Sequence, residues 1–262
     1  MNIIVCIKQV PDAKSVRFDK EKGTLIREGV EATINPFDYY ALEAGLEIRD
    51  QLGGSVTAIT MGPPQANEAL REAISMGVDK GVLLSDRAFA GADTLATTYT
   101  LAKAIHKLGG ADIFICGKQA IDGDTAQVGP GLAARLGIPS ITCVNKIDAL
   151  DGGKNFRIMR YCEEGYEVVE VATPFLITTL TTLNTPRVPS LKGMMKAKKA
   201  DIPSWDAEAI SAQPEKIGFP GSPTQVISTY VPQFQAKKEF IEGSPEEQVE
   251  ILVQRLKEAG IV

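Results

Sequence analysis

The sequence predicts an α/β fold: a doubly wound, mostly parallel sheet with added antiparallel strands and an extended C-terminal arm. Three observations lead to this prediction. Apolar strand-like runs alternate with amphipathic helical segments as far as Val144, a pattern typical of parallel sheets covered by helices. Short strand patterns without intervening helices follow residue 147. From residue 185 onward, repeated prolines interrupt any long element.

The first elements are the clearest. Asn2–Ile7 is a nearly continuous apolar run, as expected of a strand that is buried on both faces. Asn35–Leu52 has helical apolar spacing, with Asn35 as N-cap, Pro36 at the first helical position and Asp38 in the first turn. These are the usual signals of a helix start.

The same alternation continues along the chain. It predicts strands at Val56–Thr60, Gly81–Ser85, Ile113–Cys116 and Ile141–Val144, and helices at Gln65–Met76, at Asp93–Leu108 and in a segment that ends at Leu136. The last helix begins either at Asp124, with Pro130 disturbing its first turns, or at Pro130 itself.

The C-terminal part is organised differently. Strands are expected at Phe156–Tyr161, Glu167–Ala172 and Phe175–Leu180, extending the sheet with antiparallel pairing. An arm and a short helix at Glu246–Ala259 follow. We therefore expect a nucleotide-binding α/β domain at 1–184, and a partner-recognition loop and C-terminal arm with a terminal helix at 185–262.

Composition excludes several classes of function. The chain has 262 residues and a net charge of −5, which argues against a nucleic-acid surface. No apolar stretch approaches the ~18 residues of a membrane span, so we expect a cytoplasmic protein. A single histidine excludes histidine triads and multi-histidine metal sites, and the four cysteines form no CxxC pair. We expect no metal site and no catalytic residue in this chain.

A glycine-rich loop carries the main functional signal. GKQAIDGDTAQVGP (117–130) connects an apolar strand to a helix, and such a turn gathers backbone N–H groups that can hold an anion. The loop lacks the GxxxxGK[ST] pattern, and Asp122 and Asp124 would repel a triphosphate. It therefore indicates nucleotide binding rather than ATP hydrolysis, with an ordinary βα connection as the alternative.

Other loops are expected at the same edge of the sheet. They are Lys8–Asp12, Met61–Pro64 and Asp86–Asp93, each of which follows a predicted strand. Asp93 and Thr94 begin a second helix, and two helix starts suit a pyrophosphate, although such caps are also common for structural reasons alone. Asn35 is expected to offer its side-chain amide to an adenine or a ribose.

Five motifs together resemble one family. VCIKQVPD (5–12), INPFDYYALE (34–43), ITMGPP (59–64), GKQAIDGDTAQVGP (117–130) and MKAKK (195–199) resemble, in order, the electron-transfer flavoprotein β subunit. The resemblance implies an adenine-nucleotide α-hydrolase-like fold and a heterodimer with a flavin-bearing α subunit.

The resemblance also implies a ligand. It places around an adenine nucleotide the residues Cys6, Asn35, Pro36, Phe37, Asp38, Met61, Gln119, Ala120, Ile121, Asp122, Gly123, Asp124, Thr125, Ala126, Gln127, Val128, Gly129 and Pro130. Ordinary family members hold AMP. RAFAGADTLAT (87–97) is more similar to a second group, whose β subunits bind FAD that NADH reduces and whose electrons are bifurcated between ferredoxin or flavodoxin and an acyl-CoA dehydrogenase. In that group Asp93, Thr94 and Thr97 would also contact the cofactor.

A docking strip completes the prediction. LNTPRVPSLKGMMKAKK (183–199) places apolar residues among basic ones in a proline-broken loop, as adaptable docking surfaces do. The family resemblance makes it the loop that anchors the dehydrogenase, with Leu191 as the inserted side chain. The alternative is a loop packed on its own subunit. A nucleotide-sensing stress-type protein of similar fold would explain neither the strip nor the arm.

Overall fold

The computed structural model describes residues 1–12, 17–19, 24–26, 32–228 and 238–262. These residues form two compact units, 1–227 and 228–262. The functional division that we expected after residue 184 concerns partner recognition rather than compactness, and it stays a prediction.

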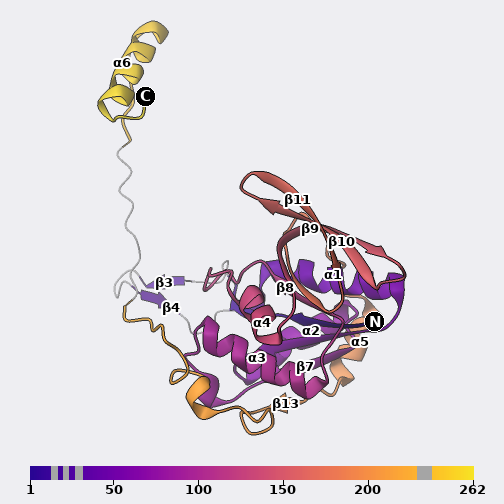
Figure 1. Cartoon of the computed structure of the whole chain (residues 1–262). Coiled ribbons are helices and arrows are strands. Elements are labelled where there is room, and N and C mark those ends of the chain that lie inside the picture. Colours follow the sequence, from indigo (N-terminus) through magenta and orange to yellow (C-terminus); the bar gives the residue numbers. More distant parts are fainter. Residues whose placement is uncertain (13–16, 20–23, 27–31, 229–237) are drawn as a thin grey trace. The chain divides into compact units, whose positions relative to one another are not determined.

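A nine-stranded sheet forms the centre of the first unit (Figure 1), in the order β11-β10-β9-β12-β8-β1-β6-β7-β13. Its strands are β1 (Asn2–Cys6), β6 (Ser55–Met61), β7 (Lys80–Leu84), β8 (Ile113–Gly117), β9 (Ser140–Leu150), β10 (Asn155–Cys162), β11 (Gly165–Ala172), β12 (Phe175–Thr179) and β13 (Ser204–Trp205). Two small antiparallel pairs lie outside it, β2 (Gln9–Pro11) with β5 (Ala32–Ile34) and β3 (Arg17–Asp19) with β4 (Thr24–Ile26). Across the sheet, each pair of neighbours in the series β9-β12-β8-β1-β6-β7-β13 is parallel.

Helices cover both faces of this sheet. They are α1 (Pro36–Leu52), α2 (Asn67–Met76), α3 (Thr94–Leu108) and α4 (Val128–Leu136), with short 3₁₀ turns at Pro64–Ala66, Arg87–Phe89 and Pro214–Lys216. Ile3 and Val5 of β1 pack with α1 and α2 in one hydrophobic cluster. Ile4 and Cys6 pack with α3 and α4 in another. This alternation explains why β1 is apolar throughout: each face of the strand serves a different helical layer.

One expectation about pairing was wrong. β10 and β11 extend the sheet with antiparallel pairing, as predicted. β12, however, lies between β8 and β9 and runs parallel to both. All five of its residues are buried, and burial on both faces is typical of a central parallel strand.

The segment after residue 185 is more ordered than we expected. Instead of a proline-broken loop it contains the helix α5 (Leu191–Lys199), because Ser190 caps its start and no proline falls within it. α5 packs against α2. Arg187 fixes the chain before α5, since its guanidinium pairs with the buried carboxylate of Glu43 at 2.8 Å.

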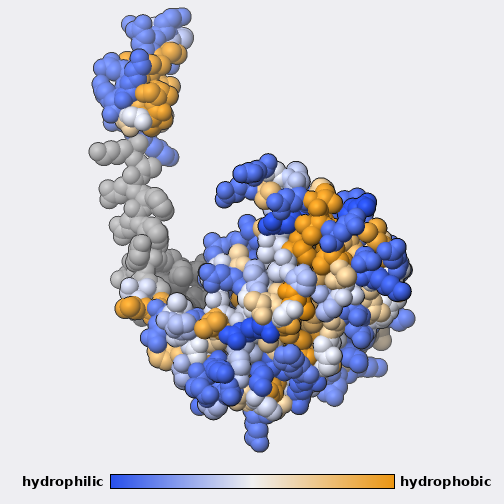
Figure 2. All heavy atoms as spheres, viewed as in Figure 1, coloured by the Kyte–Doolittle hydropathy of each residue, from blue (hydrophilic) through white to orange (hydrophobic). Residues whose placement is uncertain are grey.

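The second unit contains α6 (Pro245–Glu258), which begins with a capping box formed by Ser244 and Glu247. Val249, Leu252, Val253 and Leu256 recur at helical spacing, and Figure 2 shows the apolar side chains of α6 gathered along one side. The first three of these side chains are exposed. The helix thus has an apolar face that is left exposed by the described residues of its own unit. In the part of the chain that the structure describes, no helix is both long and apolar enough to cross a membrane.

Candidate functional site

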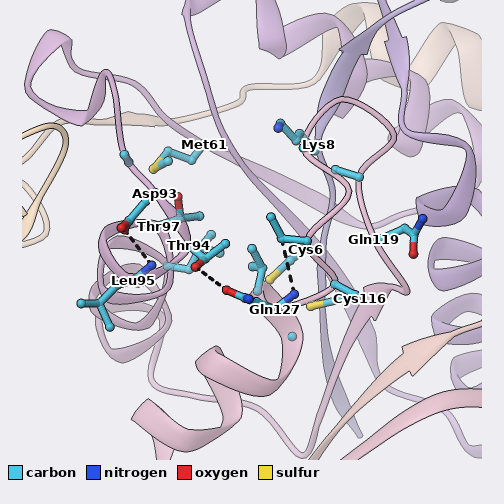
Figure 3. Close-up of a pocket in the computed structure, with 18 of the residues that line it drawn as sticks. Cys6, Lys8, Met61, Asp93, Thr94, Leu95, Thr97, Cys116, Gln119 and Gln127 are labelled. Atoms are coloured by element: carbon cyan, nitrogen blue, oxygen red, sulfur yellow. Dashed lines mark hydrogen bonds between the residues drawn. The ribbon is translucent and has the colours of Figure 1, made fainter. Parts of the chain in front are cut away.

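A cavity of about 970 Å³ opens at the carboxyl ends of β1 and β8 (Figure 3). These two strands are neighbours. After β1 the chain continues to β6 on one side of the pair, and after β8 it continues to β9 and β12 on the other side. Open α/β sheets bind ligands at such a point, where the strand order reverses. The volume of the cavity lies at the upper end of the ~300–1,000 Å³ typical of ligand cavities.

Most residues that the sequence predicted for the ligand line this cavity. They are Cys6, Asp38, Met61, Asp93, Thr94, Thr97, Gln119, Ala120, Gly123, Asp124, Thr125, Ala126, Gln127, Val128 and Gly129. Six others, Asn35, Pro36, Phe37, Ile121, Asp122 and Pro130, are not among the lining residues.

Asn35 acts through the loop rather than on the cavity. Its side-chain amide donates to the carbonyl of Gln119 at 2.8 Å and to Asp38 at 2.9 Å, and its oxygen accepts from the N–H of Ile121 at 3.1 Å. Because Asn35 is buried and these bonds engage both ends of its amide, it pins the glycine-rich loop to the start of α1. In this structure the amide supports the loop, and its contact with an adenine or a ribose stays a prediction.

The loop itself is tightly folded. The N–H of Asp124 donates to the carbonyl of Ala120 at 2.8 Å, and the Gln119 amide donates to the Asp124 carboxylate. Asp124 and Ala126 have φ of 50° and 54°, a left-handed conformation that is uncommon outside glycine. Asp122 pairs with Lys8 at 2.7 Å, so one of the two acids that would repel a phosphate is neutralised.

The start of the following helix is now defined. α4 begins at Val128 and places Pro130 in its first turn, where a missing N–H breaks no intrahelical bond. Gly129 lies so close to β12 that a Cβ on it would come within 2.4 Å of the Thr178 side chain. This close packing holds the start of α4 against the sheet beside the cavity.

α3 begins on the other side of the loop. The Asp93 carboxylate accepts from the N–H groups of Leu95 and Ala96 at 2.9 and 3.1 Å, which caps α3 as predicted. Burial raises the pKa of Asp93, but hydrogen bonds from Ala96, Thr224 and Leu95 outweigh it, so the pKa lies below its usual range. The Thr94 hydroxyl donates to the Gln127 side chain at 3.0 Å, which brings the two helix starts together.

Asp38 is a buried carboxyl group at the cavity wall. It accepts from the Lys8 N–H at 2.7 Å and from the Asn35 amide. Burial raises the pKa of Asp38 to about 7, more than these hydrogen bonds lower it. Asp38 therefore changes charge close to neutral pH.

The raised pKa predicts a pH-dependent stability. The folded protein keeps the Asp38 proton up to about pH 7, whereas the unfolded chain releases it near 3.8. The free energy of unfolding should therefore fall by a few kcal/mol as pH rises from 4 to 7, at ~1.4 kcal/mol per pKa unit. Asp38→Asn should lack this pH dependence. The difference in free energy of unfolding between the variant and the parent should therefore shift in favour of the variant from pH 5 to 7.5, as measured by urea unfolding at fixed protein concentration. As a control, Asp201→Asn at an exposed position should show the same pH dependence of the free energy of unfolding as the parent. The prediction would be contradicted if the parent and Asp38→Asn also showed the same pH dependence.

Two thiols lie side by side in the cavity wall. Cys6 and Cys116 occupy paired positions on β1 and β8, and both are free. A hydrogen bond with Cys6, together with burial, raises the pKa of Cys116 well above its usual range. The Cys116 thiol is therefore a neutral lining group. No cluster of three or more histidine, cysteine or acidic side chains suited to a metal occurs among the described residues.

Sequence reasoning missed part of the wall. The further lining residues are Ile7, Lys8, Phe89, Gly91, Ala92, Leu95, Leu101, Cys116, Gly117, Lys118, Pro223, Thr224 and Val226. Lys8 and Lys118 belong to loops that the sequence placed at this edge of the sheet, although neither was named as a ligand residue. Pro223, Thr224 and Val226 lie about 100 residues beyond the loop in sequence, and no local signal marks them.

A second surface of interest lies on α5. Arg71 of α2 donates to the carbonyls of Ala197 and Ala200 at the end of α5, and Gly193 packs closely on Ser75. The helix is therefore fixed at its base. Its outer side presents the apolar side chains of Leu191, Met194 and Met195, which are 79%, 41% and 63% exposed, beside Lys192, Lys196, Lys198 and Lys199.

Known proteins resemble the whole chain. The family model described as "Electron transfer flavoprotein domain" matches residues 22–210. The chain is 49% identical to "Electron transfer flavoprotein subunit beta" of Thermoanaerobacterium thermosaccharolyticum over 263 residues, which cover all of both chains. It is 49% identical to the protein of that name from Clostridium acetobutylicum over 98% of each chain. It is 48% identical to "Caffeyl-CoA reductase-Etf complex subunit CarD" of Acetobacterium woodii over all of both chains.

Proposed function

Because the chain belongs to the electron transfer flavoprotein family, as a β subunit, we propose that it binds FAD in this cavity and accepts hydride from NADH. The electrons are then bifurcated. One branch leads to ferredoxin or flavodoxin, and the other leads through the flavin of the α subunit to an acyl-CoA dehydrogenase.

The observation that carries this proposal is the cavity that joins two helix starts. Val128 begins α4 and Thr94 begins α3, both residues line the same cavity, and the Thr94–Gln127 hydrogen bond connects them. The start of α4 offers backbone N–H groups and the positive end of a helix dipole to an anion. At the start of α3 the Asp93 carboxylate already accepts from the N–H groups of Leu95 and Ala96, so this helix would bring the hydroxyl groups of Thr94 and Thr97 to a second phosphate. AMP carries one phosphate and FAD two, so a site with two such positions and this volume suits FAD better.

The side chains that line the cavity would hold the cofactor rather than react with it. Lys118 brings positive charge to the wall, Lys8 offsets the charge of Asp122, and Thr94 and Thr97 bring hydroxyl groups. The bound flavin would supply the redox chemistry, and the protein would supply binding, orientation and electrostatics. The buried Cys116 thiol, whose pKa is raised, adds no charge beside the ligand.

Two surfaces support the proposed partners. The exposed apolar stripe of α6 suits the α subunit, since an apolar helix face that is exposed to water is usually covered by another protein. α5 suits an acyl-CoA dehydrogenase, because it combines exposed methionines and a leucine with lysines on a rigid base. The name of the Acetobacterium woodii relative, a subunit of a caffeyl-CoA reductase complex, supports a partner that acts on a CoA thioester.

A count of flavins tests the proposal directly. The purified complex with the α subunit is denatured, and the released FAD and AMP are quantified per heterodimer. Two FAD molecules per heterodimer support the proposal. One FAD and one AMP would support instead a non-bifurcating β subunit that carries AMP as a structural ligand.

The hydroxyl groups of α3 give a prediction about affinity. Thr94→Val combined with Thr97→Val should weaken FAD binding by ~1–3 kcal/mol, since each change removes about one hydrogen bond worth ~0.5–1.5 kcal/mol. AMP should bind as before, because its single phosphate is expected at the glycine-rich loop. Equilibrium titrations with FAD and AMP measure both effects.

Thr100→Val is the matched control for this pair. Thr100 lies on the same helix, but it is buried and its hydroxyl donates to the carbonyl of Ala96 at 3.0 Å. FAD affinity should not change in this variant. If the double variant binds FAD as tightly as the parent does, α3 does not contact the second phosphate.

A further inference from the structure

We propose that residues 218–226, here called the strap, determine whether the cavity accepts a dinucleotide such as FAD or only AMP, and that Asp93 is the positioning residue that holds the strap in place. This inference rests on the proposed function. It assigns Asp93 to the protein wall rather than to direct contact with the cofactor.

The strap forms one part of the cavity wall. Pro223, Thr224 and Val226 line the cavity together with Phe89 and the start of α3. Figure 3 shows Asp93 and Thr97 on one side of the cavity and Lys8 and Gln119 on the other, with Gln127 between them. The strap therefore adjoins the α3 side of the cavity, across from Lys8 and Gln119.

Asp93 joins this wall to α3. One carboxylate oxygen, Oδ1, accepts the two capping N–H groups of α3. The other, Oδ2, accepts from the Thr224 N–H at 3.1 Å and from the Thr224 hydroxyl at 2.8 Å. Both oxygens thus already have two protein donors each. A negatively charged ligand would gain nothing from Asp93 itself, whereas the geometry of the strap depends on it.

Further contacts fix the base of the strap. The N–H of Asp93 donates to the Ser222 hydroxyl at 2.8 Å, and that buried hydroxyl lies 2.7 Å from the carbonyl of Gly218. The N–H of Phe219 donates to the carbonyl of Ala90 at 2.9 Å. Gly218 has φ of 51°, and a Cβ there would come within 2.0 Å of the Ala88 carbonyl oxygen, so this position requires glycine.

The side chains at this end of the cavity indicate what it holds. Val226 and Leu95 both line the cavity, yet they are 84% and 50% exposed. Apolar side chains that line a cavity and remain in water gain free energy when an apolar ligand surface covers them. AMP bound at the glycine-rich loop has no such group left to offer here. A second, planar and largely apolar ring system, such as that of a flavin, matches them.

Two variants test the strap. In Asp93→Asn the remaining oxygen still caps α3, because asparagine caps helices about as well as aspartate, but the oxygen that accepts from Thr224 becomes an NH₂ donor. Thr224→Val removes only the hydroxyl bond and leaves the α3 cap untouched. We expect FAD affinity of the heterodimer to fall about ten-fold or more in Asp93→Asn and less in Thr224→Val, with AMP affinity within two-fold of the parent in both.

Asp86→Asn is the matched control. Asp86 also caps a short helix, by accepting from Ala88 at 3.0 Å, and also holds a later segment, by accepting from the N–H of Ala207 at 3.0 Å. It is absent from the cavity lining. Its replacement should leave the FAD-to-AMP affinity ratio unchanged, although thermal stability falls.

The outcomes separate this inference from the proposed function. If the parent binds FAD, and the Asp93 and Thr224 variants keep its ratio of FAD affinity to AMP affinity, the role of the strap is overturned and the FAD site still stands. Equal losses of FAD and AMP would also overturn it, because the effect would then be on the fold. A parent that binds AMP but no FAD in this subunit would overturn both.

Discussion

Gly123→Val is expected to empty the nucleotide site while leaving the fold intact. Gly123 lines the cavity, and nothing lies within 4 Å of the position that a Cβ would occupy there. The protein therefore leaves room for a Cβ at this position, and we expect the valine side chain to occupy space that the ligand needs. A steric overlap of this kind typically costs ~1–3 kcal/mol, which would lower nucleotide affinity about 10- to 100-fold.

The measurement is the nucleotide released per heterodimer, together with the thermal unfolding midpoint. Gly123→Ala should give an intermediate loss, because alanine adds one carbon. Ala134→Val is the control: Ala134 is exposed on α4 and is absent from the cavity lining. If Gly123→Val folds and retains full nucleotide, the glycine-rich loop does not surround the ligand.

Leu191→Ala should separate docking from electron uptake. Leu191 is 79% exposed at the first position of α5, whose base is fixed to α2. Loss of an apolar anchor at an interface commonly costs ~1–4 kcal/mol, whereas loss of a solvated leucine costs almost nothing. Electron transfer to the acyl-CoA dehydrogenase should therefore fall when the dehydrogenase is limiting, and NADH should reduce the isolated heterodimer at the parent rate.

Val168→Ala provides the comparison, since Val168 is 61% exposed but lies on β11. Its transfer rate should equal that of the parent. Unchanged transfer in Leu191→Ala at limiting dehydrogenase would remove Leu191 from the docking site. Because α5 is a helix, we also expect Met194 and Met195 to contact the dehydrogenase together with Leu191.

The sequence alone determined the elements whose signals are local. The apolar run of β1, the Asn35–Pro36 start of α1 and the Asp93 cap of α3 each depend on residues within one turn or one strand, and all three positions were predicted. Asn35 takes the N-cap position of α1, but its side chain makes no capping hydrogen bond. The order of strands and helices then brought the glycine-rich loop to the carboxyl edge of the sheet. Most of the ligand residues predicted from the motifs consequently line the cavity.

Contacts between distant segments could be decided only by the tertiary structure. β12 has the composition of any short buried strand, and its place between β8 and β9 is defined by its pairing with both of these strands, which no local pattern shows. Asn35 could have met a ligand or a loop; the approach of Gln119 and Ile121, about 85 residues later, gives it the loop. Thr224 reaches Asp93 across 131 residues, and neither residue carries a local sign of the other. Local sequence sets backbone preference and capping, whereas burial and hydrogen-bond pairing across such separations are satisfied only once the whole chain has packed.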